Sequence, residues 1–207
     1  MSSPRVDGRT LRFQHRRPEL LAAATEYILE HGVNGLSLRP VAQALGVTHA
    51  TLLRHFSSKD ELIMAVLEKI RTGLAEQLAS EAEFREARST AELLKALWRR
   101  LCEPRQQRQF LLLFELVGQH RSKPDRDRDL TQSLVEDWID LLADRLTQDG
   151  WPPEEISALA TLLLAQVRGL QLDLLVSGDR KRTDRAIDFT IHLLDRPVEP
   201  GAVDNRG

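Results

Sequence analysis

Apolar residues between Leu36 and Leu62 recur at the spacing of short helices. One set follows an i, i+3, i+4, i+7 order, which places its members on a single helix face: Leu38, Val41, Ala42 and Leu45. Ser37 can cap this helix at its start. Gly46 can end it, because glycine adopts the left-handed conformation beyond a helix end without a steric penalty. Thr48 can cap a second short helix. The pattern therefore predicts a helix-turn-helix.

Polar residues of the predicted pair gather where a DNA groove could meet them. Side chains at the leading end of the second helix usually meet base edges in this motif, which makes His49 and Ala50 candidates for base contact. Another face of the same helix carries four polar residues: Thr48, Thr51, Arg54 and His55. A capping box of Ser58 and Glu61 would start a third helix and hold Lys59 near a phosphate. DNA binding is the leading hypothesis, and a compact helix trio with a solvated polar face is its alternative.

The spacing of apolar residues indicates helices in the rest of the chain, so we expect an all-α protein of about nine helices. The further helices are predicted at Pro18–His31, from Lys59 to beyond Leu78, at Thr90–Cys102, from Pro104 onwards, around Leu134–Leu146, at Glu154–Val176 and at Asp184–Leu194. The helix after Pro104 contains the apolar stretch Phe110–Gly118, so we expect it to be buried on every side. Glu115 interrupts that stretch, and a carboxylate there must find a cation, a donor or a proton.

Four parts are expected along the chain. Residues 1–16 and the adjacent Arg17 contain several arginines with Pro4 and Gly8 and are predicted to form a flexible basic arm that enters a minor groove or lies along phosphates. A disordered tail with no role is the alternative. Residues 17–57 form the helix-turn-helix domain, and residues 58–195 form a helical body. Residues 196–207, with two prolines and two glycines, are predicted to be a disordered tail.

Charge is distributed unevenly, although the net charge is only −2. Residues 1–58 contain seven Arg and four acidic residues (+3), and the remainder contains 22 basic and 27 acidic residues (−5). A basic domain on an acidic body could dock on phosphates in one orientation. Arginines that merely solubilise the N-terminus are the alternative.

Several functional classes are disfavoured by the sequence. The single cysteine, Cys102, excludes an intramolecular disulfide and any multi-thiolate metal site. We find no Gly-rich phosphate loop, no paired metal-ligand spacing and no GxSxG elbow, so we expect neither an enzyme nor a cofactor. The N-terminus lacks the apolar region of a signal peptide, and no segment approaches the roughly 18 apolar residues that span a bilayer. We therefore expect a cytoplasmic protein without a membrane partner.

The segment GVTHATLLRHFSSKDEL resembles the TetR family of bacterial transcriptional repressors, and the correspondence extends from about Pro18 to Val66. The family's pattern is a GVS-like turn, a short LYxHF-type helix and a Lys-Glu-Leu-like start to the fourth helix. The resemblance implies base contacts by Arg39, His49 and Ala50. It implies contacts to the DNA backbone by Thr48, Thr51, Arg54, His55 and Lys59. One departure is Leu53, where the family has an aromatic residue, so a contact by that side chain is in doubt.

A homodimer is expected because the last two helices would expose part of their apolar surface in a monomer. TetR-family proteins pair in this way. Two helix-turn-helix domains, one from each subunit and here called the heads, would then be related by a two-fold axis and would read a palindromic operator. The alternative is that these helices complete the core of a monomer. The expected interface residues are Leu164, Leu175, Ala186, Ile187, Thr190, Leu193 and Leu194.

A pocket for a small, largely apolar effector is expected between the body helices. Its expected apolar lining is Trp98, Cys102, Phe110, Phe114, Val117, Trp138 and Leu142, and its expected polar anchors are Glu115, His120, Gln166 or Arg168. An ordinary core position is the alternative for each of them. The favoured interpretation is a ligand-responsive repressor that binds operator DNA as a homodimer. A helical protein-interaction module that binds no DNA, or a small helical enzyme, is the alternative.

Overall fold

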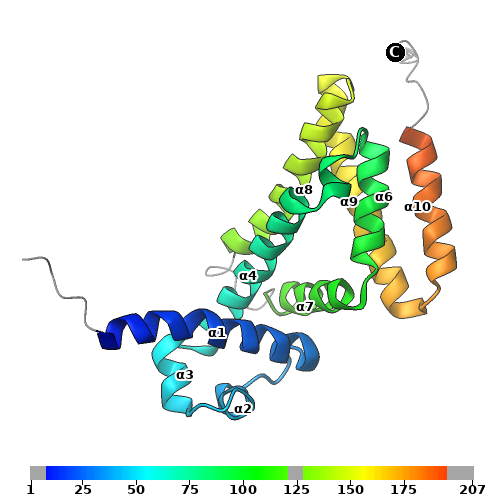
Figure 1. Ribbon diagram of the computed structural model, residues 1–207. Helices are drawn as coiled ribbons and strands as arrows, with labels where there is room; N and C mark the ends of the chain where they lie inside the picture. The colour runs from blue at the N-terminus through cyan, green and yellow to red at the C-terminus, as the bar shows by residue number, and fades with distance from the viewer. Residues whose placement is uncertain (1–7, 121–127, 195–207) are drawn as a thin grey trace, which may run out of the picture. The chain divides into compact units, whose positions relative to one another are not determined.

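The computed structural model describes residues 8–120 and 128–194, and this part of the chain is helical and contains no strand (Figure 1). Its ten helices are α1 (Gly8–His31), α2 (Leu38–Ala44), α3 (His49–His55), α4 (Lys59–Ser80), α5 (Ala82–Arg85), α6 (Thr90–Leu101), α7 (Pro104–His120), α8 (Arg128–Gln148), α9 (Pro153–Ser177) and α10 (Arg180–Leu194). The expected all-α fold is confirmed. The additional helix is α5, a single turn too short to show a periodic pattern.

The chain divides into two compact units. The first unit comprises Met1–Glu76 and Arg108–Leu134, and the second comprises Gln77–Gln107 and Val135–Gly207. This division differs from a boundary at residue 57, because the first part of α4 and most of α7 belong to the first unit. Apolar side chains explain the difference, since Leu112 and Leu116 of α7 are part of the first unit's core.

The core of the first unit is built from the faces that the apolar spacing predicted for α2, α3 and α4. Val41, Leu52, Phe56 and Leu62 are completely buried there. Helix α1 covers them with Ala24 and Ile28, which are also completely buried. Burial of this kind stabilises the folded state by about 1.5–3 kcal/mol for each Val, Leu, Ile or Phe side chain. It also stabilises the short helices α2 and α3, which would not be stable alone.

Helix α1 begins ten residues earlier than the predicted start at Pro18. It runs through Pro18, which lies inside the helix and is exposed. A proline in a helix interior removes one hydrogen bond and crowds the preceding turn, but the preceding residues include good helix formers such as Leu11 and Arg12. Residues 8–16 of the expected flexible arm are therefore helical, and residues 1–7 lie outside the described part. The expected tail, 196–207, also lies outside it.

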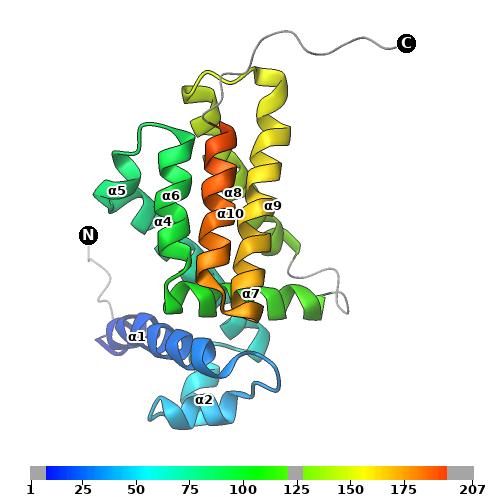
Figure 2. The ribbon, with the colours of Figure 1, turned by 90° about the vertical axis from the view of Figure 1, so that its right-hand side faces the viewer.

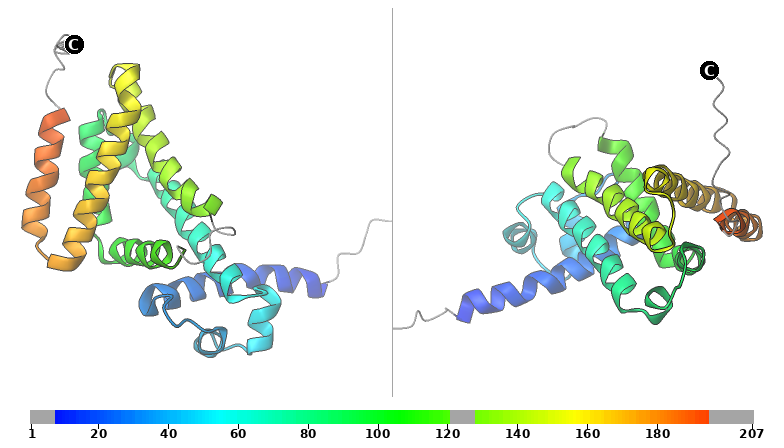
Figure 3. Two further views of the ribbon diagram at one scale, coloured as in Figure 1. Left: turned by 180° about the vertical axis from the view of Figure 1, so that it is seen from behind. Right: turned by 90° about the horizontal axis from the view of Figure 1, so that it is seen from above.

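The second unit contains α6, α9 and α10 running side by side together with the later part of α8 (Figure 2). Its core includes Leu97, Leu142, Leu146 and Ile187, each no more than 2% exposed. Helices α9 and α10 form a hairpin that turns at Gly178, where φ is +67° and glycine avoids the Cβ strain of a left-handed residue (Figure 3).

The expectation that no segment is long and apolar enough to span a bilayer was wrong for helix α9. Pro153–Ser177 is long and apolar enough to do so by length and composition, with a mean hydropathy of 1.5. Core helices pass the same test, and seven residues of α9 are buried within this chain, among them Leu163, Val167 and Leu174. One such helix is weak evidence for a membrane span.

Candidate nucleic-acid interface

The turn between α2 and α3 is formed by backbone hydrogen bonds around Gly46. The N–H of Gly46 donates to the carbonyl of Gln43 at 3.1 Å, and the N–H of Val47 donates to the carbonyl of Ala42 at 2.9 Å. Gly46 has a φ of +66°, a conformation that glycine adopts without strain. The predicted helix-turn-helix is therefore present, with the two helices in contact.

The caps of the two helices differ. Thr48 Oγ1 accepts a hydrogen bond of 3.1 Å from the N–H of Thr51, as predicted for the start of α3. Ser37 occupies the corresponding position of α2, but its side chain makes no cap hydrogen bond, so that part of the prediction was wrong. Side-chain capping thus fixes α3 more firmly than α2.

The start of α4 is capped from both directions, with one change from the predicted box. Ser58 Oγ accepts from the N–H of Glu61 at 3.0 Å, as expected. The carboxylate of Glu61, however, accepts from the N–H of Ser57 at 2.8 Å and from its hydroxyl, rather than from Ser58. These hydrogen bonds lower the pKa of Glu61, because they favour its charged form.

Seven of the eight predicted DNA-contacting residues have side-chain surface available. Four are exposed: Arg39, Thr48, Ala50 and Arg54. Three are half-buried: His49, Thr51 and Lys59. Leu53, which takes the place of the family's aromatic residue, is 36% exposed. These residues lie on α2, at the N-cap of α3 and within it, and in the first turn of α4.

His55 is the exception, because it is only 6% exposed. The predicted contact of its ring with the DNA backbone is therefore corrected: the ring belongs to the inner side of α3. Burial lowers the pKa of His55, and the positive charges of Arg16, Arg17 and Arg54 lower it further. The neutral form is favoured, so this residue adds no positive charge to the candidate interface near neutral pH.

Arg17 on α1 was expected to contribute to DNA binding as part of the basic arm, whereas the structure shows it in contact with the junction of α3 and α4 in three ways. Its Nε donates to the carbonyl of His55 at 3.3 Å. Its guanidinium carbon lies 4.9 Å from the centre of the Phe56 ring, and one terminal nitrogen lies 3.5 Å from a carboxylate oxygen of Glu61. Partners 38 and 44 residues away leave no local signal in the sequence.

Glu115 finds its partner within the first unit. Its carboxylate accepts a hydrogen bond of 3.0 Å from the N–H of Val33. It also lies so close to Gly32 that a Cβ at that position would be 3.0 Å from one carboxylate oxygen. The expectation that this carboxylate needs a donor is met by the backbone just after α1.

Helix α7 is not buried on every side, contrary to the prediction. Leu112 and Leu116, on one face of the helix, are each 3% exposed. Leu111, Phe114 and Val117 on the opposite face are 48%, 47% and 53% exposed. A long apolar run in the sequence does not distinguish a helix covered on all sides from a helix that leaves one apolar face open.

The expected effector-binding residues are divided between the two units. Phe110, Phe114, Glu115 and Val117 belong to the first unit, and Trp98, Cys102, Trp138, Leu142, Gln166 and Arg168 belong to the second. The side chain of His120 lies outside the described part. Trp98 is buried and donates through Nε1 to Asp184 Oδ1 at 2.6 Å. Burial raises the pKa of the Cys102 thiol to about 11.

The expected dimer-interface residues also separate into two groups. Leu164 and Ile187 are 6% and 2% exposed within their own chain, so their assignment to a dimer interface is corrected to the second unit's core. Leu175, Ala186, Thr190 and Leu194 are half-buried, and Leu193 is 47% exposed. Four exposed apolar residues of α9 and α10 were not predicted: Leu162, Leu172, Val176 and Phe189.

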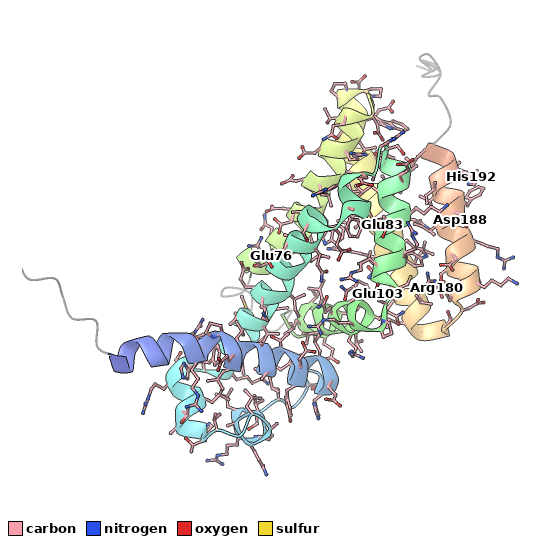
Figure 4. All side chains as sticks on the ribbon, in the orientation of Figure 1. Glu76, Glu83, Glu103, Arg180, Asp188 and His192 are labelled. Carbon is pink, nitrogen blue, oxygen red and sulfur yellow. The ribbon has the colours of Figure 1, made fainter. Side chains whose placement is uncertain are left out.

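Helix α9 therefore carries apolar residues on two opposite sides. At about 100° per residue, the buried positions of α9 centre on one side of the helix. The opposite side presents Ala158, Leu162, Ala165, Gly169, Leu172 and Val176. On α10, Asp188 and His192 project away from α6 (Figure 4), near the exposed Phe189 and Leu193. We call Leu162, Leu172, Val176, Phe189 and Leu193 the outer apolar residues.

Among the described residues, no three His, Cys, Asp or Glu side chains lie close enough to hold a metal ion. The exposed chemistry of the first unit is instead that of arginines, a lysine, a histidine and hydroxyl groups around a short helix. Such groups are suited to phosphates and base edges.

Comparison with known proteins agrees with this geometry. Residues 20–66 match the family model described as "Bacterial regulatory proteins, tetR family". A segment of 63 residues is 41% identical to the HTH-type transcriptional repressor Rv3405c of Mycobacterium tuberculosis, which covers 30% of this chain and 34% of that protein. The match thus spans about a third of that relative. It confirms the resemblance inferred from the residues around α2, α3 and α4.

Two longer matches extend the similarity over most of the chain. The HTH-type transcriptional repressor AcnR of Corynebacterium diphtheriae is 24% identical over 180 residues, which covers 84% of this chain and 88% of that protein. A crystal structure of a putative transcriptional regulator from Saccharomonospora viridis in complex with choline superposes with a TM-score of 0.70. It has 22% identity and covers 88% of this chain and 97% of that one. The matched proteins are named as regulators, which agrees with the expectation of a non-enzyme.

Proposed function

We propose that this chain, whose residues 20–66 match the family model of the TetR family of bacterial regulatory proteins, regulates transcription by binding an operator as a homodimer. The observation that carries the proposal is the arrangement of α2 and α3. Their apolar faces are completely buried at Val41 and Leu52, while Arg39 and Arg54 remain exposed. Such a helix pair can enter a major groove without exposing its core.

The proposed division of labour follows the positions of the side chains. Arg39, His49 and Ala50 contact base edges, since they lie at the leading ends of α2 and α3. Thr48, Thr51, Arg54 and Lys59 contact the DNA backbone, which fixes the orientation of α3 in the groove. His55 supports α3 from the inside and has no DNA contact in this proposal.

Dimerisation is proposed through the outer apolar residues of α9 and α10. A stripe opposite the core-facing side of α9 is more than a monomer needs. A two-fold axis brings the same patch of each subunit together. Two copies of α3 would then read DNA half-sites that lie one or more turns of the double helix apart, roughly 34–36 Å for each turn. Leu175, Ala186, Thr190 and Leu194 are proposed to border this interface.

The proposed effector is a small, largely apolar molecule that binds in the second unit, where Trp98, Cys102, Trp138, Leu142 and Gln166 lie. It would act by favouring a state with a different separation of the two heads, and it could shift DNA binding only by its preference for that state. The Saccharomonospora viridis relative was crystallised with choline, a small quaternary ammonium cation, so choline would test a cationic effector against the proposed apolar one. Repression is proposed because two relatives are named as repressors.

Selection from a random DNA library with the purified chain tests the proposal. We expect enrichment of inverted repeats with a fixed spacing, and binding that weakens as salt rises. An Arg39→Ala/Arg54→Ala double variant is the control, since both side chains are exposed and their loss leaves the core intact. Enrichment of no sequence, or equal enrichment by the double variant, would refute the proposed function.

A further inference from the structure

Arg17 is the one described residue of the first half of α1 whose side chain contacts both the end of α3 and the start of α4. It lies outside the residues matched by the family model, which begin at residue 20. Resting on the proposed function, we infer that Arg17 is a positioning residue that sets the orientation of α3 for operator recognition and makes no DNA contact of its own.

The first step of the argument concerns the end of α3. The carbonyl of His55 lies in the last turn of α3 and accepts a 3.3 Å hydrogen bond from Arg17 Nε. A positive charge at a helix C-terminus also interacts favourably with the helix dipole. The N-terminus of α3 is fixed by the Thr48 cap. Arg17 thus stabilises the C-terminal end of α3, whereas the Thr48 cap stabilises its N-terminal end.

The second step concerns the turn from α3 to α4. The guanidinium of Arg17 lies over the ring of Phe56, which is completely buried, with 4.9 Å between the guanidinium carbon and the ring centre. A planar guanidinium can stack on an aromatic face while its edge donates hydrogen bonds, which an ammonium cannot do. The identity of this residue, and not only its charge, is therefore important.

The third step concerns Glu61. Its carboxylate accepts hydrogen bonds from both Ser57 groups and lies 3.5 Å from Arg17. The pair is exposed and would contribute little alone. Here it connects α1 to Glu61, whose own N–H donates to the capping Ser58 Oγ at the start of α4, so one side chain links α1 with both α3 and α4.

A competing role is a direct contact with phosphate, which salt titration distinguishes. A lost phosphate contact weakens binding to all sequences alike and flattens the slope of log affinity against log salt by about one unit. A lost positioning residue weakens operator binding more than random-DNA binding and leaves the slope unchanged. The difference arises because base contacts require a fixed orientation, whereas non-specific contacts tolerate small rotations.

The test compares Arg17→Ala, Arg17→Lys and Arg16→Ala in the full chain, on the selected operator and on random DNA across a salt series. Arg16 is the matched control, because it is the adjacent arginine of the same helix and is exposed. We expect Arg17→Ala to lower operator affinity roughly three- to ten-fold with an unchanged slope, as the loss of about 1 kcal/mol of orientation energy implies. Arg17→Lys should recover less than half of that loss.

A double-mutant cycle with Glu61→Gln gives a second readout. If Arg17 acts partly through Glu61, the double variant should lose less operator affinity than the two single variants together. A flatter salt slope for Arg17→Ala, or equal behaviour of Arg17→Ala and Arg16→Ala, would overturn the inference. If the unmodified chain selects no operator at all, the proposed function fails instead, so the two failures are distinguishable.

Discussion

Glu115 Oε2 on α7 accepts a 3.0 Å hydrogen bond from the backbone N–H of Val33, which lies 82 residues earlier in the chain. Val33 is completely buried and follows Gly32, whose own N–H donates to the carbonyl of Ile28 at the end of α1. The carboxylate thus satisfies a buried donor that helix α1 does not. In this way α7 becomes part of the first unit.

Replacing Glu115 should reveal the value of that hydrogen bond. Glu115→Leu leaves the Val33 N–H buried without an acceptor, which costs about 1–3 kcal/mol of unfolding free energy. Glu115→Gln retains an acceptor oxygen and should cost less. Denaturant unfolding measures both, and hydrogen exchange at Val33 reports the local effect. Equal losses for the two variants would mean that the hydrogen bond is unimportant.

The two helix caps provide a matched comparison. Thr48→Ala removes the acceptor for the Thr51 N–H and should reduce the unfolding free energy by about 1 kcal/mol. Ser37 occupies the same position of α2 without a side-chain cap bond. Ser37→Ala should therefore change stability by less than about 0.5 kcal/mol. A reversed order in thermal or denaturant unfolding would contradict the described capping.

Most parts of the structure that depend on local sequence were predictable, with the Ser37 cap as an exception, and the parts that depend on distant partners were not. The apolar spacing located α2 and α3, and Gly46 and Thr48 located their turn and cap. The role of Arg17 depends on His55 and Glu61, which come from other helices. The burial of His55 depends on α1 lying over α3, because the residue's spacing alone places it on the same face as Thr48 and Thr51.

Apolar helices were the harder case, because a run of apolar residues does not identify the surface that covers it. Leu164 and Leu162 are two positions apart on α9, yet the first is 6% exposed and the second 62%. Sequence reasoning therefore identified the two helices of the proposed interface. It assigned some residues to the interface that in fact face the core of their own chain, and it missed some that face outward. Likewise, α7 was expected to be covered on all sides, but the face with Leu111, Phe114 and Val117 is exposed.

Charge on the outer apolar residues should prevent dimerisation if the proposed interface is correct. We expect Leu172→Glu and Phe189→Glu to shift the protein from dimer to monomer mass in sedimentation, because a carboxylate cannot be buried in an apolar interface without a partner. Ser157→Glu is the control, since it adds the same charge on an exposed side of α9 away from the stripe. Dimers that persist in both test variants would place the interface elsewhere.

Cys102 makes stability depend on pH in the alkaline range. Burial raises the pKa of its thiol from 9.0 to about 11 in the folded chain, so the folded state holds this proton more tightly than the unfolded state. The corresponding stability is fully present below about pH 9 and is lost as the pH rises through about 11. Unfolding free energies measured from pH 8 to 11 should fall more steeply for the unmodified chain than for Cys102→Ala. Identical slopes would contradict this role of burial.

The central claim is that α2, α3 and the start of α4 grip DNA with separate base-reading and phosphate-binding side chains. The most direct test is a salt titration of Arg39→Ala and Lys59→Ala on the selected operator and on random DNA. We predict that Arg39→Ala loses about 1–3 kcal/mol on the operator alone and relaxes its base preference, while Lys59→Ala weakens both DNAs alike and flattens the salt slope by about one unit. Identical effects of the two substitutions on operator and random DNA would contradict the account.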